Sequence, residues 1–248
     1  MNYCLKLIAS SLLGLGLLVA AAPAACAQDD LGMSMFNSAN QAAVNLSLVN
    51  INNAAVLASA HGAAAGRREA ASSTSHASLS YTPTAALKQQ TVQRMAQQLS
   101  VRNAAAGQAI TNAFGPGKKD YSELFGEMVK PSGLPANNAA TAFAAYLELA
   151  YTIINGADER SITPAMDQAL QRQAAGILGK NQALSSPAAV ARTGEEFKLQ
   201  TVLLYVGWQT TKKSGQEAAF RSSIAHSLQA KGLDLSTLKL TAQGLVKK

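Results

Sequence analysis

The most apolar stretch of the chain runs from Ala139 to Ile154 and carries a single charge. Apolar residues repeat on one side at helical spacing, and further apolar residues cover much of the other side. A helix that is apolar around most of its circumference packs in the middle of a bundle. A second apolar stretch, from Glu195 to Thr211, is predicted to pack against the first. We expect its aromatic residues, Tyr205 and Trp208, to belong to the core and not to a ligand site.

Shorter amphipathic stretches surround these two in the sequence. Thr82 before Pro83 is typical of a helix start, and the same pair recurs at 163 and 164. The sequence Thr193-Gly194-Glu195-Glu196 predicts a capping box that begins the second apolar helix, after a separate turn of helix at 187–192. The predicted helices occupy about 83–100, 103–114, 120–129, 139–155, 164–179, 195–211 and 214–231.

These elements predict an all-α fold, a single compact bundle of about six helices within residues 81–248. The tail from Leu233 to Val246 alternates apolar and polar residues, so we expect it to lie extended over the bundle, with Gly244 at a turn. Residues 28–80 form a low-complexity segment rich in Ala, Asn and Ser, which we interpret as a largely flexible linker.

The amino terminus has the pattern of a secretory signal peptide at residues 1–27. Lys6 precedes an apolar run, and small residues follow up to Ala27. We predict cleavage after Ala27 and a periplasmic or secreted protein that is not transmembrane after cleavage. A lipoprotein attached at Cys26 is the alternative, although Pro23 stands where a lipoprotein signal usually has a branched aliphatic residue.

Composition and charge exclude several classes. Cys4 and Cys26 both precede the predicted cleavage site, so the mature chain would have no thiol, disulfide or cysteine metal site. Lys and Arg outnumber Asp and Glu by 21 to 14. The basic residues are spread out and do not alternate with aromatic residues, so we expect no nucleic-acid partner. An anionic surface is one possible partner, and simple solubility is the alternative meaning of the charge.

Three stretches resemble an uncharacterised family of secreted bacterial helical domains, a domain of unknown function. They are Tyr81-Thr82-Pro83, the helical sequence 143–147, and the segment from Gly232 to Val246, which is the most specific of the three. The resemblance covers about two-thirds of the chain and leaves residues 28–80 unmatched. It implies the boundary of the helical domain and assigns no activity or site residue.

Few residues offer chemistry. His61 and His76 lie in the linker without a neighbouring ligand cluster, and His226 is predicted on the surface, so we expect no metal site and no cofactor. Glu148 interrupts the apolar helix 139–154 and shares a strip with small and polar residues. If this strip is buried, Glu148 is a candidate general acid, with Asp167 as an example of a second carboxylate. We favour the alternative that the strip faces water or a neighbouring backbone.

The sequence therefore favours a non-catalytic module that binds a protein or another component of the bacterial envelope. The rival is a secreted hydrolase or lyase acting on cell-wall glycan, with Glu148 as general acid. A cleft that holds Glu148 together with a second carboxylate is the observation that distinguishes them. The particular partner and the oligomeric state are not encoded in any pattern we recognise.

Overall fold

The structure is a computed structural model that describes residues 78–248. The predicted signal peptide and most of the predicted linker, with Cys26, His61 and His76, lie outside the described residues. Within them the chain forms seven α-helices, four short 3-10 helices and one two-stranded hairpin, which confirms the all-α prediction. The α-helices are α4 (Ala85–Arg102), α5 (Ala104–Phe114), α6 (Tyr121–Val129), α7 (Ala139–Asn155), α8 (Pro164–Gly179), α9 (Pro187–Ser214) and α10 (Glu217–Gln229).

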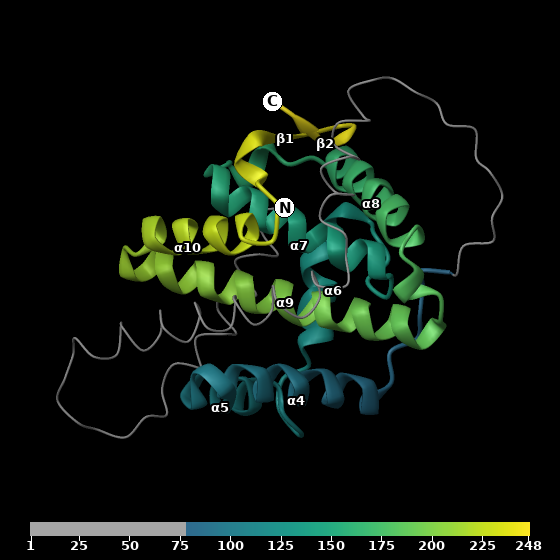
Figure 1. Cartoon of the computed structure of the whole chain (residues 1–248), viewed down its shortest axis with the longest axis vertical. Helices are drawn as coiled ribbons and strands as arrows, with labels where there is room; N and C mark the ends of the chain where they lie inside the picture. The colour runs from purple at the N-terminus through teal and green to yellow at the C-terminus, as the bar shows by residue number, and fades with distance from the viewer. Residues whose placement is uncertain (1–77) are drawn as a thin grey trace.

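Helix α9 crosses the middle of the described fold, with α4 and α5 on one side and α7, α8 and α10 on the other (Figure 1). Its main partner is α7, as the two apolar stretches predict. The ring centroids of Phe143 and Phe197 lie 4.8 Å apart, and those of Tyr146 and Phe197 lie 5.7 Å apart. These three side chains have no exposed surface, so they form the centre of the core.

The ends of α7 follow the sequence signals closely. The side chain of Asn138 accepts hydrogen bonds from the backbone N–H groups of Ala140 and Thr141. At the other end Gly156 adopts a left-handed conformation with φ of 61°, and its N–H group bonds back to the last turn. Both features agree with the predicted range of this helix, 139–155.

Helix α9 begins earlier than predicted and is continuous over 28 residues. Ser186 accepts a hydrogen bond from the N–H group of Ala189, and Pro187 occupies the first turn, so the helix starts there. The predicted capping box is wrong, because Thr193, Gly194 and Glu195 lie inside the helix and are buried. The predicted turn at 187–192 is the first part of the same helix.

Two other helix starts also differ from the prediction. The chain stays extended through Tyr81, because its N–H group bonds to the carbonyl of Asn137 at 3.0 Å, and α4 is capped by Thr84 and not by Thr82. Ser214 is the last residue of α9, and Gly215 ends that helix in the left-handed region with φ of 71°. Helix α10 therefore starts at Glu217 without a side-chain cap.

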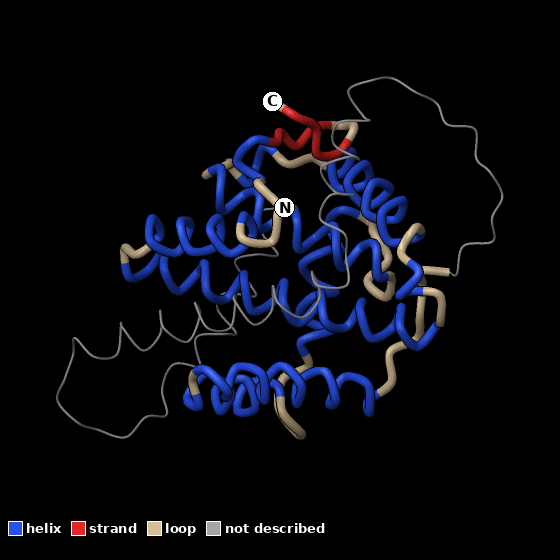
Figure 2. Tube along the Cα trace, viewed as in Figure 1, coloured by secondary structure: helices blue, strands red, loops and turns tan. Residues whose placement is uncertain are grey.

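The tail forms a hairpin of two antiparallel strands, β1 (Leu238–Thr241) and β2 (Gly244–Lys247), which follows the 3-10 helix Leu235–Thr237 (Figure 2). Leu240 and Leu245 face each other across the hairpin and are buried. The expected turn at Gly244 is present, with φ of 97°. The sequence predicted an extended tail without this pairing.

No helix of the described residues has the length and apolar content that a membrane span requires.

Candidate functional site

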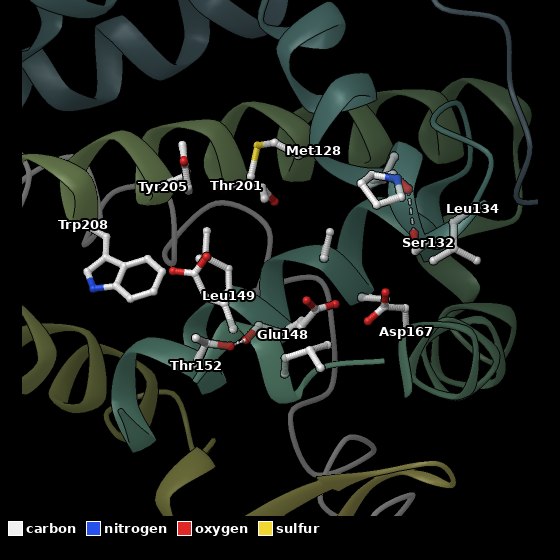
Figure 3. A pocket seen from close by; sticks show the side chains of 16 residues that line it. Met128, Ser132, Leu134, Glu148, Leu149, Thr152, Asp167, Thr201, Tyr205 and Trp208 are labelled. Atoms are coloured by element: carbon white, nitrogen blue, oxygen red, sulfur yellow. Dashed lines mark hydrogen bonds between the residues drawn. The ribbon is translucent and has the colours of Figure 1, made fainter. Parts of the chain in front are cut away.

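A small pocket lies where α7, α8 and α9 meet the end of α6 (Figure 3). Its volume is about 90 Å³, which suits the end of a side chain or a few water molecules and is small beside pockets of ~300–1,000 Å³ for drug-sized ligands. Apolar residues from α6, α7 and the loops form much of its wall. Its polar lining consists of Ser132, Glu148, Thr152, Glu159, Asp167, Thr201, Tyr205 and Trp208.

The two carboxylates that the sequence singled out line this pocket together. Glu148 lies on α7 and is partly buried, and Asp167 lies in the first turn of α8 and is 5% exposed. Their carboxyl groups face each other in Figure 3. The strip around Glu148 is buried, since Thr141 and Thr152 are 0% and 3% exposed. The strip therefore does not face water, and of the two alternatives we favoured only contact with neighbouring elements remains, because α8 and α9 pack against α7.

The two carboxyl groups of this pair influence each other's pKa. Burial raises the pKa of Glu148 well above its ordinary value, and the negative charge of Asp167 and a hydrogen bond to it raise this pKa further. Burial also raises the pKa of Asp167, whereas the hydrogen bond from Glu148 lowers it. The N-terminal end of α8 favours the ionised form of Asp167. These effects together favour protonation at Glu148 and the negative charge at Asp167.

Oδ1 of Asp167 is buried, and apart from the Glu148 carboxyl no group of the described residues donates to this carboxylate. Three hydroxyl groups of the lining donate hydrogen bonds to backbone carbonyls three or four residues earlier in the chain. Ser132 donates to the carbonyl of Val129, Thr152 to that of Glu148, and Thr201 to that of Phe197. These hydroxyls present only acceptor oxygens to the pocket. The three hydroxyl oxygens and the Asp167 carboxylate are thus acceptors, and the donors of the lining are the Tyr205 hydroxyl and the Trp208 indole N–H.

A basic side chain lies at one end of the pocket, near Trp208. The Lys212 ammonium is 3.5 Å from the centroid of the Trp208 ring and 3.1 Å from Oε1 of Glu159. Tyr205 is buried beside them, and burial raises its pKa to about 12, helped by the charge of Glu159. Sequence analysis assigned Trp208 to the core, but it is only partly buried and lines the pocket. The spacing of Trp208 and Lys212, four residues apart in a helix, is the signal that could have revealed this contact.

A second group of buried polar residues, the Glu195 cluster, lies nearer the N-terminal end of α9, beside α6. The Glu195 carboxylate accepts hydrogen bonds from the hydroxyls of Tyr81 and Tyr121 at 2.9 and 2.7 Å and pairs with Lys198 at 2.7 Å. Lys198 also donates to Ser122 and Asn137.

Every strong donor of the Glu195 cluster thus has a partner. Burial lowers the pKa of Lys198 and the bond to Glu195 opposes this, whereas burial and the Glu195 charge raise the pKa of Tyr81 and Tyr121. A fully paired cluster leaves no group for a ligand, so we assign it a structural role.

The remaining site residues from the sequence can also be placed. His226 is exposed on α10, as predicted. Among residues 78–248, no group of three His, Cys, Asp or Glu side chains lies close enough together to hold a metal ion.

The arrangement of the carboxyl pair limits its chemistry. Glycosidases separate their two carboxyl groups by about 5–5.5 Å when retaining and ~6.5–9.5 Å when inverting. Glu148 and Asp167 are close enough to share a hydrogen bond, which is closer than either class requires. The pair resembles a dyad that holds one proton between two carboxyls.

No curated protein and no solved structure was found to match the chain. The sequence model of a family of unknown function, DUF6683, matches residues 6–248. This match covers the C-terminal segments whose resemblance we noted, and it also spans the region 28–80 that the resemblance left out. The chain therefore belongs to DUF6683, a family of unknown function.

Proposed function

We propose that the protein is an exported helical module that binds a protein or another component of the bacterial envelope and catalyses no reaction on it. Export is supported by the signal-peptide pattern of residues 1–27. Binding is supported chiefly by one observation, the pocket at which Asp167 presents a buried carboxylate oxygen without a protein donor. A buried polar atom left without a partner is costly unless another molecule supplies the missing hydrogen bond.

The charge distribution also supports a binding site here. The full chain has 14 acidic residues against 21 basic ones, yet three acidic residues, Glu148, Glu159 and Asp167, line this one pocket. The charge of this pocket is thus opposite to the net charge of the protein. Such a local difference lets a binding site select ligands by their charge.

Export can be tested with the full chain expressed in a bacterium, by cell fractionation and sequencing of the mature amino terminus. A chain that starts at Gln28 in the periplasm or medium is expected. An uncleaved chain in the cytoplasm would contradict export. Addition of a lipid at Cys26 would instead select the lipoprotein alternative.

Binding can be tested by sedimentation of the exported protein with isolated bacterial envelopes. The comparison includes Asp167→Asn and, as a control for net charge, Glu127→Gln at an exposed position of α6. Wild type and Glu127→Gln are expected to sediment alike, and Asp167→Asn severalfold less. If wild type stays in solution the proposal fails, and if all three sediment equally the pocket has no part in binding.

A second candidate function is a secreted hydrolase or lyase acting on cell-wall glycan, with Glu148 as general acid. The proton that Glu148 retains beside Asp167 favours it, because a general acid must be protonated at working pH. The short separation of the two carboxyls disfavours a two-carboxylate glycosidase and fits a single acid better. Wall-lytic activity that Glu148→Gln abolishes would support this function, and activity unchanged in that variant would refute this role of Glu148.

A further inference from the structure

We propose that the pocket binds the primary ammonium group of a lysine-type side chain, with its carbon stem along the apolar wall and its N–H groups on Asp167 and its neighbours. The inference rests on the proposed function, because it names the chemical class of ligand for the same site.

The first argument is the chemistry of the lining. Asp167 provides a buried anionic oxygen without a protein donor. Ser132, Thr152 and Thr201 add hydroxyl oxygens whose hydrogens are already used. An ammonium group has three donors and no acceptor, so it complements a lining that is mostly acceptors. A carboxylate or phosphate would be repelled by the negative charges of Asp167 and Glu159.

The second argument is the size and apolar content of the pocket. A volume of about 90 Å³ admits the end of a chain and not a sugar ring with its hydroxyls. Met128, Leu149 and Ile162 provide apolar wall of the kind against which the four-carbon stem of a lysine packs while its charged end stays bonded. A metal ion fits less well, because the acidic residues do not form a group that could hold one within the described residues.

The third argument is that two residues of the lining, Trp208 and Glu159, already bind an ammonium group of the protein itself. Lys212 places its Nζ over the face of Trp208 and bonds to Glu159. Aromatic faces and carboxylates used together are the usual surroundings of bound alkylammonium groups. The site thus shows the contacts that a second, deeper ammonium would extend towards Asp167.

Binding should release a proton. The pKa of Glu148 is raised beside Asp167, and an ammonium bound next to the pair lowers this pKa by direct attraction. The other titratable groups that face the pair are Glu159 from the 3-10 helix Glu159–Ser161, and Tyr205 and Lys212 from α9. Glu159 is already paired with Lys212, which leaves Glu148 as the group whose protonation changes.

The full exported protein can be titrated with N-acetyl-lysine-N-methylamide, and with the same compound acetylated on its ε-amine as a matched neutral control. Trp208 is the only tryptophan of the chain, so its fluorescence reports on the pocket directly. We expect saturable binding of the charged probe and at least about tenfold weaker binding of the acetylated one. Calorimetry in buffers of different ionisation enthalpy should detect proton release with the charged probe.

Three variants locate the ammonium. Asp167→Asn should weaken binding of the charged probe at least about tenfold, with the helical circular dichroism unchanged. Should that variant fail to fold, Glu148→Gln provides the second measurement, since it should abolish the proton release. Lys212→Met should strengthen binding severalfold by removing the competing ammonium.

Equal affinity for the two probes, or charged-probe binding that survives Asp167→Asn unchanged, would overturn the inference. If Asp167-dependent sedimentation with envelopes persists while the lysine probe fails, the ligand class is wrong and the binding function stands. If the probe binds as expected and the protein does not sediment with envelopes, the ligand class is right and the envelope-binding function is wrong.

Discussion

Lys198 and Glu195 pair at 2.7 Å with no side-chain surface exposed on either residue. They lie three positions apart on α9, and each of the three hydrogens of the Lys198 ammonium reaches a different acceptor, on Glu195, Ser122 and Asn137. A buried pair of this kind offsets a large desolvation cost only while both partners are present.

We therefore expect Lys198→Met to lower the free energy of unfolding by about 3–5 kcal/mol, because it leaves a buried carboxylate with fewer donors. Equilibrium denaturation by guanidinium chloride measures this. The double variant Glu195→Gln/Lys198→Met should lose less than the sum of the two single changes. Strict additivity would show that the two side chains do not depend on each other.

Two buried tyrosines provide a matched pair of hydroxyl deletions. Tyr121 donates to Glu195 at 2.7 Å, whereas the hydroxyl of Tyr146 is buried without a hydrogen-bond partner among the described residues. Tyr121→Phe should cost about 1.5–3 kcal/mol of unfolding free energy, and Tyr146→Phe should be neutral or stabilising by ~1 kcal/mol. Thermal unfolding of both variants against wild type tests the contrast, and a larger loss from Tyr146→Phe would contradict it.

A methyl group added at position 194 has no room. A Cβ on Gly194 would lie 2.4 Å from Cε1 of Tyr81. Gly194→Ala should therefore lower the free energy of unfolding by about 1–3 kcal/mol, because it displaces the Tyr81 ring and breaks the hydrogen bond from the Tyr81 hydroxyl to Glu195. Gly176→Ala is the control, because Gly176 is exposed within α8 and nothing lies within 4 Å of its added Cβ. The free energy of unfolding of Gly176→Ala should rise by about 0.4–1 kcal/mol. Equal effects at the two sites would refute the steric explanation.

The carboxyl pair gives the protein a pH-dependent stability. The pKa of Glu148 is raised in the folded state, so the folded protein binds this proton more tightly than the unfolded chain does. The stabilising contribution is complete below the unfolded pKa of about 4.3 and is lost as pH rises through the folded pKa.

Glu148→Gln should remove that loss, because a glutamine cannot ionise. The midpoint of denaturant unfolding, measured from pH 4 to pH 9, should show the variant more stable than wild type at the upper end and similar at the lower end. Glu127→Gln removes the same charge from an exposed position and should not change the shape of the pH profile. A wild-type profile parallel to that of Glu148→Gln would exclude the shift.

The contrast between α7 and α9 shows how far sequence reasoning reaches. The bounds of α7 follow from local signals, a capping asparagine and a terminal glycine, and the predicted range 139–155 is correct. The start of α9 was not, because Thr193-Gly194-Glu195-Glu196 has the letters of a capping box. Gly194 leaves room for the ring of Tyr81 because it has no side chain, and Glu195 accepts a hydrogen bond from the Tyr81 hydroxyl. Both causes are tertiary contacts with a residue more than a hundred positions away, and no local pattern encodes them.

The sequence also predicted some residues of the candidate site but not how they are arranged. Glu148 was identified as a candidate because a lone acid in an apolar helix is unusual, and Asp167 was named as an example of a second carboxylate. Whether they meet depends on how α8 packs on α7, which periodicity does not specify. Trp208 and Lys212 were missed because an aromatic residue in an apolar helix is most simply assigned to the core, and only the packed structure shows which face of the helix remains partly exposed.

The tail hairpin adds a last example of a tertiary cause. The side-chain amide of Gln173 accepts from the N–H group of Leu245 and donates to its carbonyl, at 2.9 and 3.0 Å. This one side chain takes the place of a third strand at that position, so the pairing of β2 is completed by a helix residue.

The unbroken length of α9 links its two polar regions mechanically. Glu195, which holds Tyr81, and Trp208, which lines the pocket, lie on the same helix and are separated by about 20 Å at ~1.5 Å per residue. A continuous helix resists compression along its axis, so an axial shift of one of these positions shifts the other by the same amount. Any axial displacement of α9 that accompanies filling of the pocket would be transmitted to the hydroxyl of Tyr81, and so to the point where the amino-terminal segment joins the bundle.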